Sequence, residues 1–202
     1  ELVLEPCAAP APAADELQLA VEAAGVNFRD VMNALGVYPG DPEPLGKECA
    51  ARVTAVGAEV SGFAVGDPVI ALTGGAFRSI VNAKAARVVA RPAQLTAAHA
   101  ATLPVAFLTA EHALTNLAEL RPGEVILIHA AAGGVGQAAV QCAQAVGATV
   151  IATAGSRRKR ELLRARGVAH VLDSRTLDFE HQVLELTEGR GVDVVLNSLA
   201  HE

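Results

Sequence analysis

The hydrophobic pattern along the chain separates a first part rich in short apolar runs from a second part with longer periodic segments. A strand-like alternation of residues predicts a strand at 17–23, and further short apolar runs are bounded by glycines. A helix is expected over 28–35, and the prolines before residue 13 suggest an extended first segment. Strands are expected at 17–23, 51–56, 68–72 and 87–91.

From residue 96 onward, helical and strand-like segments alternate. Thr96 is expected to cap a helix, and a longer helical stretch, broken by Pro104, runs toward Leu117. Helices are expected at 135–146, 158–166 and 179–187, and strands at 125–129, 148–154, 168–172 and 192–196. This alternation predicts a doubly wound parallel sheet. The fold class is therefore α/β, with a β-rich domain at 1–95 and a doubly wound domain at 96–202.

A glycine-rich turn joins the first strand and first helix of the second part. It reads Ala131-x-Gly133-x-x-Gly136, a GxGxxG pattern with alanine in the first place. Small residues let the backbone approach a pyrophosphate, and a helix N-terminus offers it free N–H groups and partial positive charge. The predicted dinucleotide contacts are Ala132, Gly133, Gly134, Val135 and Gly136. Because the pattern alone is weak, the alternative is an ordinary strand-to-helix turn.

The segment after the next expected strand favours an additional phosphate. A carboxylate for the ribose 2′-hydroxyl is expected here, but Gly155-Ser-Arg-Arg-Lys-Arg160 holds none before Glu161. A serine hydroxyl and several cations attract a 2′-phosphate, so the cofactor is predicted to be NADPH, held by Ser156, Lys159 and Arg160. The alternative is a solvated basic helix start, although cations there oppose the helix dipole.

Composition narrows the class of protein. The chain is 51% hydrophobic but only 3% aromatic, so its core is expected to be aliphatic. A net charge of −6 argues against nucleic acid as a partner. No apolar run reaches the roughly 18 residues of a membrane span and no leader opens the chain, so a cytoplasmic protein is expected. Three widely spaced cysteines and scattered histidines predict reduced thiols and no metal site.

Taken together, the chain resembles the enoyl reductase domain of modular polyketide synthases and animal-type fatty acid synthases. That domain belongs to the medium-chain dehydrogenase/reductase superfamily, with quinone oxidoreductases as near relatives. Asn27-Phe-Arg-Asp30 together with Val195-Leu-Asn-Ser-Leu199 carries the resemblance to the synthase domains. The matching segments are 25–30, 36–40, 103–110, 121–124, 129–136, 173–176 and 191–199.

The resemblance implies a GroES-like domain beside a Rossmann domain, with the active site in the cleft between them. It also implies that NADPH gives hydride to the β-carbon of an α,β-enoyl thioester on an acyl carrier protein, and that a proton goes to the α-carbon. Tyr38 is the implied proton donor, and Asn27 and Thr109 match positions near the nicotinamide and its ribose. Each has a simpler alternative: Tyr38 packing on its loop, Asn27 capping a helix and Thr109 bonding a helical carbonyl.

Three further residues are assigned by their expected place in the fold. Arg175 is placed near the adenosine ribose, with a surface ion pair as its alternative. Asn197 follows the strand at 192–196, at the carboxyl edge of the sheet where such folds bind ligands. His129 ends the strand at 125–129 and is expected in the core rather than in the cleft.

Departures from the family pattern qualify these expectations. Zinc-dependent members place a cysteine near Asn27 and a histidine in a Gly-His-Glu motif, where this chain has Gly46-Lys47-Glu48, so the zinc-free branch is indicated. The family often has glycine where this chain has Ala51, and an aromatic pair where it has Glu111 and His112. The second difference leaves the chain length of the substrate open.

Family members continue at both ends, and a lysine and an aspartate proposed to serve protonation lie past residue 202. The chain is therefore expected to be a fragment that is less stable than the intact domain, and inactivity of the fragment remains open. Other synthase domains are expected partners, and dimerisation is open for the intact domain. The rival functions are a separate NADPH-dependent quinone or alkenal reductase and a non-catalytic interaction domain.

Overall fold

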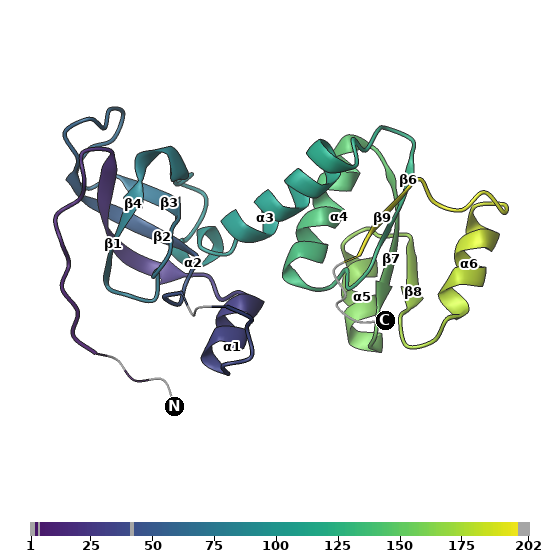
Figure 1. The fold of residues 1–202 in the computed structure, drawn as a ribbon. Coiled ribbons are helices and arrows are strands. Elements are labelled where there is room, and N and C mark those ends of the chain that lie inside the picture. The colour runs from purple at the N-terminus through teal and green to yellow at the C-terminus, as the bar shows by residue number, and fades with distance from the viewer. Residues whose placement is uncertain (1–2, 4, 41–42, 198–202) are drawn as a thin grey trace. The chain divides into compact units, whose positions relative to one another are not determined.

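The computed structural model describes residue 3, residues 5–40 and residues 43–197, and it divides into two units, Glu1–Val105 and Ala106–Glu202 (Figure 1). Each unit has its own sheet and its own core. The division falls later than residue 95, where the sequence pattern changes. The reason is helix α2 (Ala97–Ala100), because the buried Ala100 and Ala101 pack against Ala50 and Ile70 of the first sheet.

The first unit is a five-stranded antiparallel sheet in the order β4-β1-β2-β3-β5. Its strands are β1 (Glu16–Ala24), β2 (Glu48–Val56), β3 (Pro68–Leu72), β4 (Ile80–Lys84) and β5 (Val88–Ala90). Helix α1 (Phe28–Ala34) follows β1, and a 3-10 turn, η1 (Ala85–Arg87), precedes β5. The four expected strands and the helix are confirmed. Strand β4 was not expected, because only Val81 and Ala83 of its five residues are buried.

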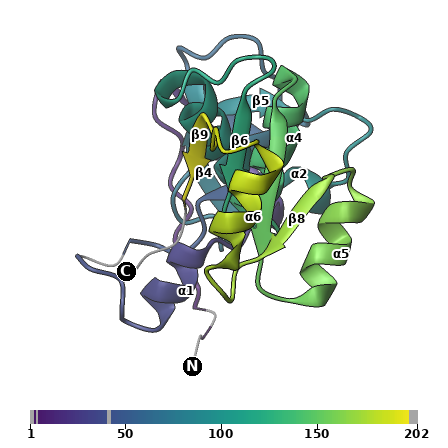
Figure 2. The same ribbon diagram turned by 90° about the vertical axis from the view of Figure 1, so that its right-hand side faces the viewer.

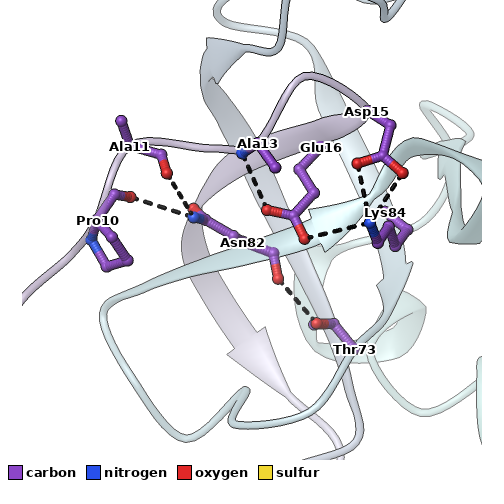
Figure 3. Close-up of polar contacts among 8 residues, drawn as sticks. All are labelled: Pro10, Ala11, Ala13, Asp15, Glu16, Thr73, Asn82 and Lys84. Atoms are coloured by element: carbon purple, nitrogen blue, oxygen red, sulfur yellow. Dashed lines mark hydrogen bonds and ion pairs between the residues drawn. The ribbon is translucent and has the colours of Figure 1, made fainter.

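The extended segment before β1 is held against this sheet by polar contacts (Figure 3). The side-chain amide of Asn82 on β4 donates to the carbonyls of Pro10 and Ala11 over 3.1 and 3.3 Å. Nearby, the Lys84 ammonium pairs with the Asp15 carboxylate at 2.8 Å. Proline has no backbone N–H, so its carbonyl is the one backbone group through which Pro10 can hydrogen-bond to the sheet.

The second unit is a parallel sheet in the order β8-β7-β6-β9. Its strands are β6 (Val125–Ile128), β7 (Thr149–Ala154), β8 (His170–Asp173) and β9 (Val194–Leu196). Helix α3 (Pro104–Glu111) begins in the first unit and continues into the second. The further helices are the π-helical η2 (His112–Leu117), α4 (Gly134–Val146), α5 (Arg157–Ala165) and α6 (Asp178–Leu186). Pro104 begins α3, the helical position at which its missing N–H costs nothing.

Alternate residues of the buried strand β6 face opposite layers of helices. Ile126 and Ile128 pack in the cluster that contains Leu163 of α5 and the alanines of α4, whereas Leu127 packs with Val183 of α6. Figure 1 shows α4 and α6 on opposite sides of the strands, and Figure 2 shows α6 lying across one face of the sheet. The doubly wound α/β fold is confirmed. In the part of the chain that the structure describes, no helix is long and apolar enough to cross a membrane.

Candidate functional site

The turn between β6 and α4 has the close packing that its glycines predict. Gly133 is the N-cap of α4, and its N–H donates to the carbonyl of Ala130, which has a positive φ of 48°. A Cβ on Gly136 would lie 2.5 Å from that carbonyl oxygen and 2.6 Å from the Cα of Ala131, so this glycine is required by the fold. A Cβ on Gly134 would meet nothing within 4 Å, which leaves open space at the start of the helix.

A cavity of about 430 Å³ lies beside this turn, where β6, β7 and β8 end. Five residues that the sequence indicated line it together: Ala132, Gly133, Ser156, Lys159 and Arg175. Four further residues that sequence reasoning missed complete the lining: Ala130, Ala154, Gly155 and Ser174. Their positions next to expected lining residues were the available signal. Parallel α/β sheets bind ligands at this carboxyl edge.

Ser156 and Lys159 lie in the first turn of α5. Ser156 is the N-cap, and its Oγ accepts the backbone N–H of Lys159 over 3.4 Å. A hydroxyl has one proton to give as well as lone pairs to accept, so the capping bond leaves the Ser156 O–H able to donate to a ligand. The cavity therefore presents a hydroxyl and an ammonium from one helical turn.

Arg175 lies over the backbone of Gly155. Its Nε donates to the Gly155 carbonyl over 3.4 Å, and its backbone N–H donates to Oδ1 of Asp173 over 2.9 Å. A Cβ on Gly155 would stand 2.6 Å from Nε of Arg175, so a larger residue would force the guanidinium to shift. The contact that sequence reasoning missed here is this packing of an arginine on a glycine.

Arg160 has contacts of a different kind. Its Nη1 donates to Oδ2 of Asp173 over 2.8 Å and to the carbonyl of Ala154 over 3.0 Å, and its side chain is only 20% exposed. It is not among the residues that line the cavity. The structure therefore separates Arg160 from Ser156 and Lys159, with which the sequence had grouped it.

The remaining expected residues of the second unit lie elsewhere. Val135 is in the first turn of α4, Thr109 is exposed on α3, and Asn197 is exposed directly after β9. None of these three is among the described residues that line the cavity, and neither are Gly134 and Gly136 of the turn. Ser198 and Leu199 of the Asn-Ser-Leu motif lie outside the described residues.

His129 is half-buried and is not among the described residues that line the cavity. Its Nδ1 lies 3.0 Å from Oγ1 of Thr153, and its ring meets that of Phe179 edge-on at 5.3 Å. Burial lowers the pKa of His129 below its ordinary value, which favours the neutral ring. This half-buried histidine belongs to none of the described core clusters, so its assignment to the core stays a prediction.

In the first unit, Asn27 is the N-cap residue of α1 and shares a capping box with Asp30, as its simpler alternative expects. Nδ2 donates to Oε1 of the buried Glu48 over 2.9 Å, and Oε2 of Glu48 accepts the N–H of Val105 over 2.8 Å. Asp30, which is also buried, accepts the backbone N–H of Asn27 over 2.9 Å. Two buried carboxylates therefore fix the backbone and the side chain of Asn27, and sequence reasoning missed both.

Tyr38 lies in the loop after α1 and is half-buried. The guanidinium of Arg29 lies 4.6 Å from the centre of its ring, and Arg29 also pairs with Glu43 over 3.0 Å. The ring thus has the packing partner that the simpler alternative for Tyr38 requires. Arg29 belongs to the Asn-Phe-Arg-Asp segment, so the signal was present in the sequence.

Among residues 3, 5–40 and 43–197, no group of three or more histidine, cysteine, aspartate or glutamate side chains lies close enough to hold a metal ion. Cys49, which directly follows Glu48 in β2, is fully buried. Burial raises the pKa of its thiol to about 11, with the Glu48 carboxylate as a second cause.

Comparison with known proteins agrees with this two-part structure. Residues 13–93 match the family model of the alcohol dehydrogenase GroES-like domain, and residues 134–202 match that of zinc-binding dehydrogenases. Among curated relatives, the pikromycin polyketide synthase component PikAII of Streptomyces venezuelae is 50% identical over 189 residues, which cover 93% of this chain and 5% of that protein.

Solved structures give the same result. The CurK enoyl reductase is 46% identical with a TM-score of 0.93, over 98% of this chain and 63% of that one. The quinone oxidoreductase of Escherichia coli, solved as a complex with NADPH, is 34% identical with a TM-score of 0.88, over 98% of this chain and 62% of that one. This chain belongs to the medium-chain dehydrogenase/reductase superfamily and is similar to its polyketide synthase enoyl reductase domains.

Proposed function

We propose that the chain is part of an NADPH-dependent enoyl reductase of a polyketide or fatty acid synthase, which reduces the α,β double bond of an enoyl thioester carried on an acyl carrier protein. The observation that carries the proposal is the cavity at the ends of β6, β7 and β8. There a glycine turn faces a hydroxyl, an ammonium and a guanidinium, from Ser156, Lys159 and Arg175.

The residues present suit NADPH. The volume of about 430 Å³ is within the range of small-molecule sites. The open space at Gly134, and the N–H groups that a helix start leaves without intrahelical partners, suit a pyrophosphate, which we assign to residues 132–136. None of the cavity-lining residues that the structure describes carries a carboxylate, so nothing in the lining repels a 2′-phosphate. When bound, NADPH supplies the hydride.

The other requirements of the reaction fall on the protein. A proton must reach the α-carbon, and we assign this step to the hydroxyl of Tyr38. Asn27, Thr109 and Asn197 are our assignments for the nicotinamide end. The amide of Asn27 is well suited to hold one orientation because its Nδ2 is fixed by Glu48.

The partners follow from the relatives. The chain matches about a tenth or less of the length of several polyketide synthases, and the S. venezuelae relative is one of them. This supports other domains of the same synthase as partners, and an acyl carrier protein as the carrier of the substrate. A synthase of this kind would work in the cytoplasm.

The first test is a titration with NADPH and then NADH, followed by nucleotide fluorescence. We expect NADPH to bind about 10-fold more tightly or better, which corresponds to about 1.4 kcal/mol. From the cavity lining we assign the 2′-phosphate to Ser156, Lys159 and Arg175, in place of the set with Arg160 that the sequence indicated. Equal affinities would contradict this assignment. Failure of both this chain and a longer version of it to bind either nucleotide would contradict the dinucleotide site.

The second candidate is a separate NADPH-dependent quinone or alkenal reductase, which the similarity to the E. coli quinone oxidoreductase favours. The substrate separates the two. Reduction of free quinones, without reduction of an enoyl group on an acyl carrier protein, would support this alternative.

A further inference from the structure

Asp173 places a negative charge next to the proposed phosphate cavity. It is the last residue of β8, and the two residues that follow it, Ser174 and Arg175, both line the cavity. Its Oδ1 accepts the backbone N–H of Arg175 over 2.9 Å, so it is needed to shape the turn that carries Arg175. Its side chain is 42% exposed, so its charge is open to the solvent.

A carboxylate at this place repels a 2′-phosphate. Charges interact over a Debye length of about 8 Å at physiological ionic strength. Asp173 is two residues from the cavity-lining Arg175, and two residues of chain span at most about 7 Å, so the charge of Asp173 acts on an anion bound there. The repulsion falls mainly on the phosphate, because the rest of the adenosine is neutral. A protein that keeps Asp173 for the geometry of the turn must therefore cancel its charge.

Arg160 is placed to cancel it. Its Nη1 donates to Oδ2 of Asp173 over 2.8 Å and to the carbonyl of Ala154 over 3.0 Å. Two acceptors thus fix the guanidinium, and the pair carries no net charge. The charges of Lys159 and Arg175, which line the cavity, then remain available for an anion.

We infer that Arg160 sets the preference for a 2′-phosphate by masking the charge of Asp173, and does so without touching the phosphate. Arg160 is therefore a positioning and specificity-determining residue, whereas Ser156, Lys159 and Arg175 are the binding residues. The inference rests on the proposed function, since it takes the cavity as the site of the adenosine 2′-phosphate.

The test uses 2′,5′-ADP and 5′-AMP, which differ only in the 2′-phosphate, with calorimetry on the whole 202-residue chain. We expect Arg160→Gln to weaken 2′,5′-ADP by about 5-fold through the unmasked charge, and to change 5′-AMP by less than about 2-fold. The double variant Arg160→Gln/Asp173→Asn should restore the wild-type affinity for 2′,5′-ADP. Asparagine keeps a carbonyl oxygen to accept the N–H of Arg175.

Arg164→Gln is the matched control. It removes one positive charge from the same helix, but Arg164 donates to the carbonyl of Val171. We expect Arg164→Gln to leave the affinities for 2′,5′-ADP and 5′-AMP within about 2-fold of the wild-type values, because solvent ions screen the loss of a more distant charge. Equal loss in Arg164→Gln and Arg160→Gln would overturn the masking role.

The outcomes separate the inference from the proposed function. If the double variant binds 2′,5′-ADP as weakly as Arg160→Gln does, Arg160 contacts the phosphate itself and masking is wrong. No change in Arg160→Gln, or equal weakening of both ligands, also overturns it. If the wild-type chain binds 2′,5′-ADP no more tightly than 5′-AMP, the phosphate site of the proposed function fails, and the inference fails with it.

Discussion

The side-chain amide of Asn27 donates over 2.9 Å to the carboxylate of Glu48, which is only 3% exposed. Gly25 is part of the same arrangement, since a Cβ there would lie 2.4 Å from Oε1 of Glu48. The other oxygen of the carboxylate accepts the N–H of Val105. A single buried anion thus satisfies two donors and orients the residue that we assign to the nicotinamide.

Glu48→Gln is expected to lower the free energy of unfolding by about 2 kcal/mol, because two charge-assisted hydrogen bonds become weaker and one N–H donor faces an amide N–H₂. Chemical denaturation measures the loss. Glu59→Gln is the control, since Glu59 is exposed and its substitution should stay within about 0.5 kcal/mol. Equal stability of the two variants would show that the buried carboxylate is dispensable.

The glycines of the β6–α4 turn give a matched pair. Gly136→Ala should destabilise the protein by about 1–3 kcal/mol, because its Cβ would meet the backbone of Ala130 and Ala131 at 2.5 and 2.6 Å. Gly134→Ala should leave thermal stability unchanged, since nothing lies within 4 Å, but should weaken NADPH by occupying the space assigned to the pyrophosphate. Unchanged NADPH affinity in Gly134→Ala would move the pyrophosphate away from this turn.

The fold could be predicted from sequence wherever the pattern is local. Alternation gave β1, and the apolar runs gave the parallel strands with their helices. The cap of α2 by Thr96 was readable from one residue type at one position. Strand β4 was not, because two buried residues in five, Val81 and Ala83, do not make a periodic signal.

The site could be predicted only in part, for a related physical reason. The lining residues follow directly from the ends of β6, β7 and β8, so Gly133, Ser156 and Arg175 were found. The partners that fix charges come from distant positions: Asn27 and Glu48 are 21 residues apart in sequence, and Arg160 meets Asp173 only because β7 and β8 are adjacent. No periodicity signals such pairs.

Tyr38→Phe tests the assigned proton donor. In an intact reductase domain that includes this chain, we expect kcat to fall by about 100-fold, the size of effect typical for loss of a general acid. Stability and NADPH affinity should not change, because phenylalanine keeps a ring against Arg29. Turnover equal to that of the wild type would leave Tyr38 with packing as its role.

The raised pKa of the Cys49 thiol predicts a loss of stability at alkaline pH. Its thiol pKa is raised by burial to about 11 from an ordinary value of 9.0, so the folded state holds the proton more tightly than the unfolded state does. Its contribution is complete below pH 9 and is lost as the pH rises toward 11. Cys49→Ala should flatten this part of the stability profile, measured by urea denaturation between these pH values. Tyrosine and lysine titrate in the same range in the wild type and in Cys49→Ala, so the difference between the two stability profiles isolates the thiol. Identical slopes of the two profiles would mean that Cys49 ionises in the folded state as easily as in the unfolded one.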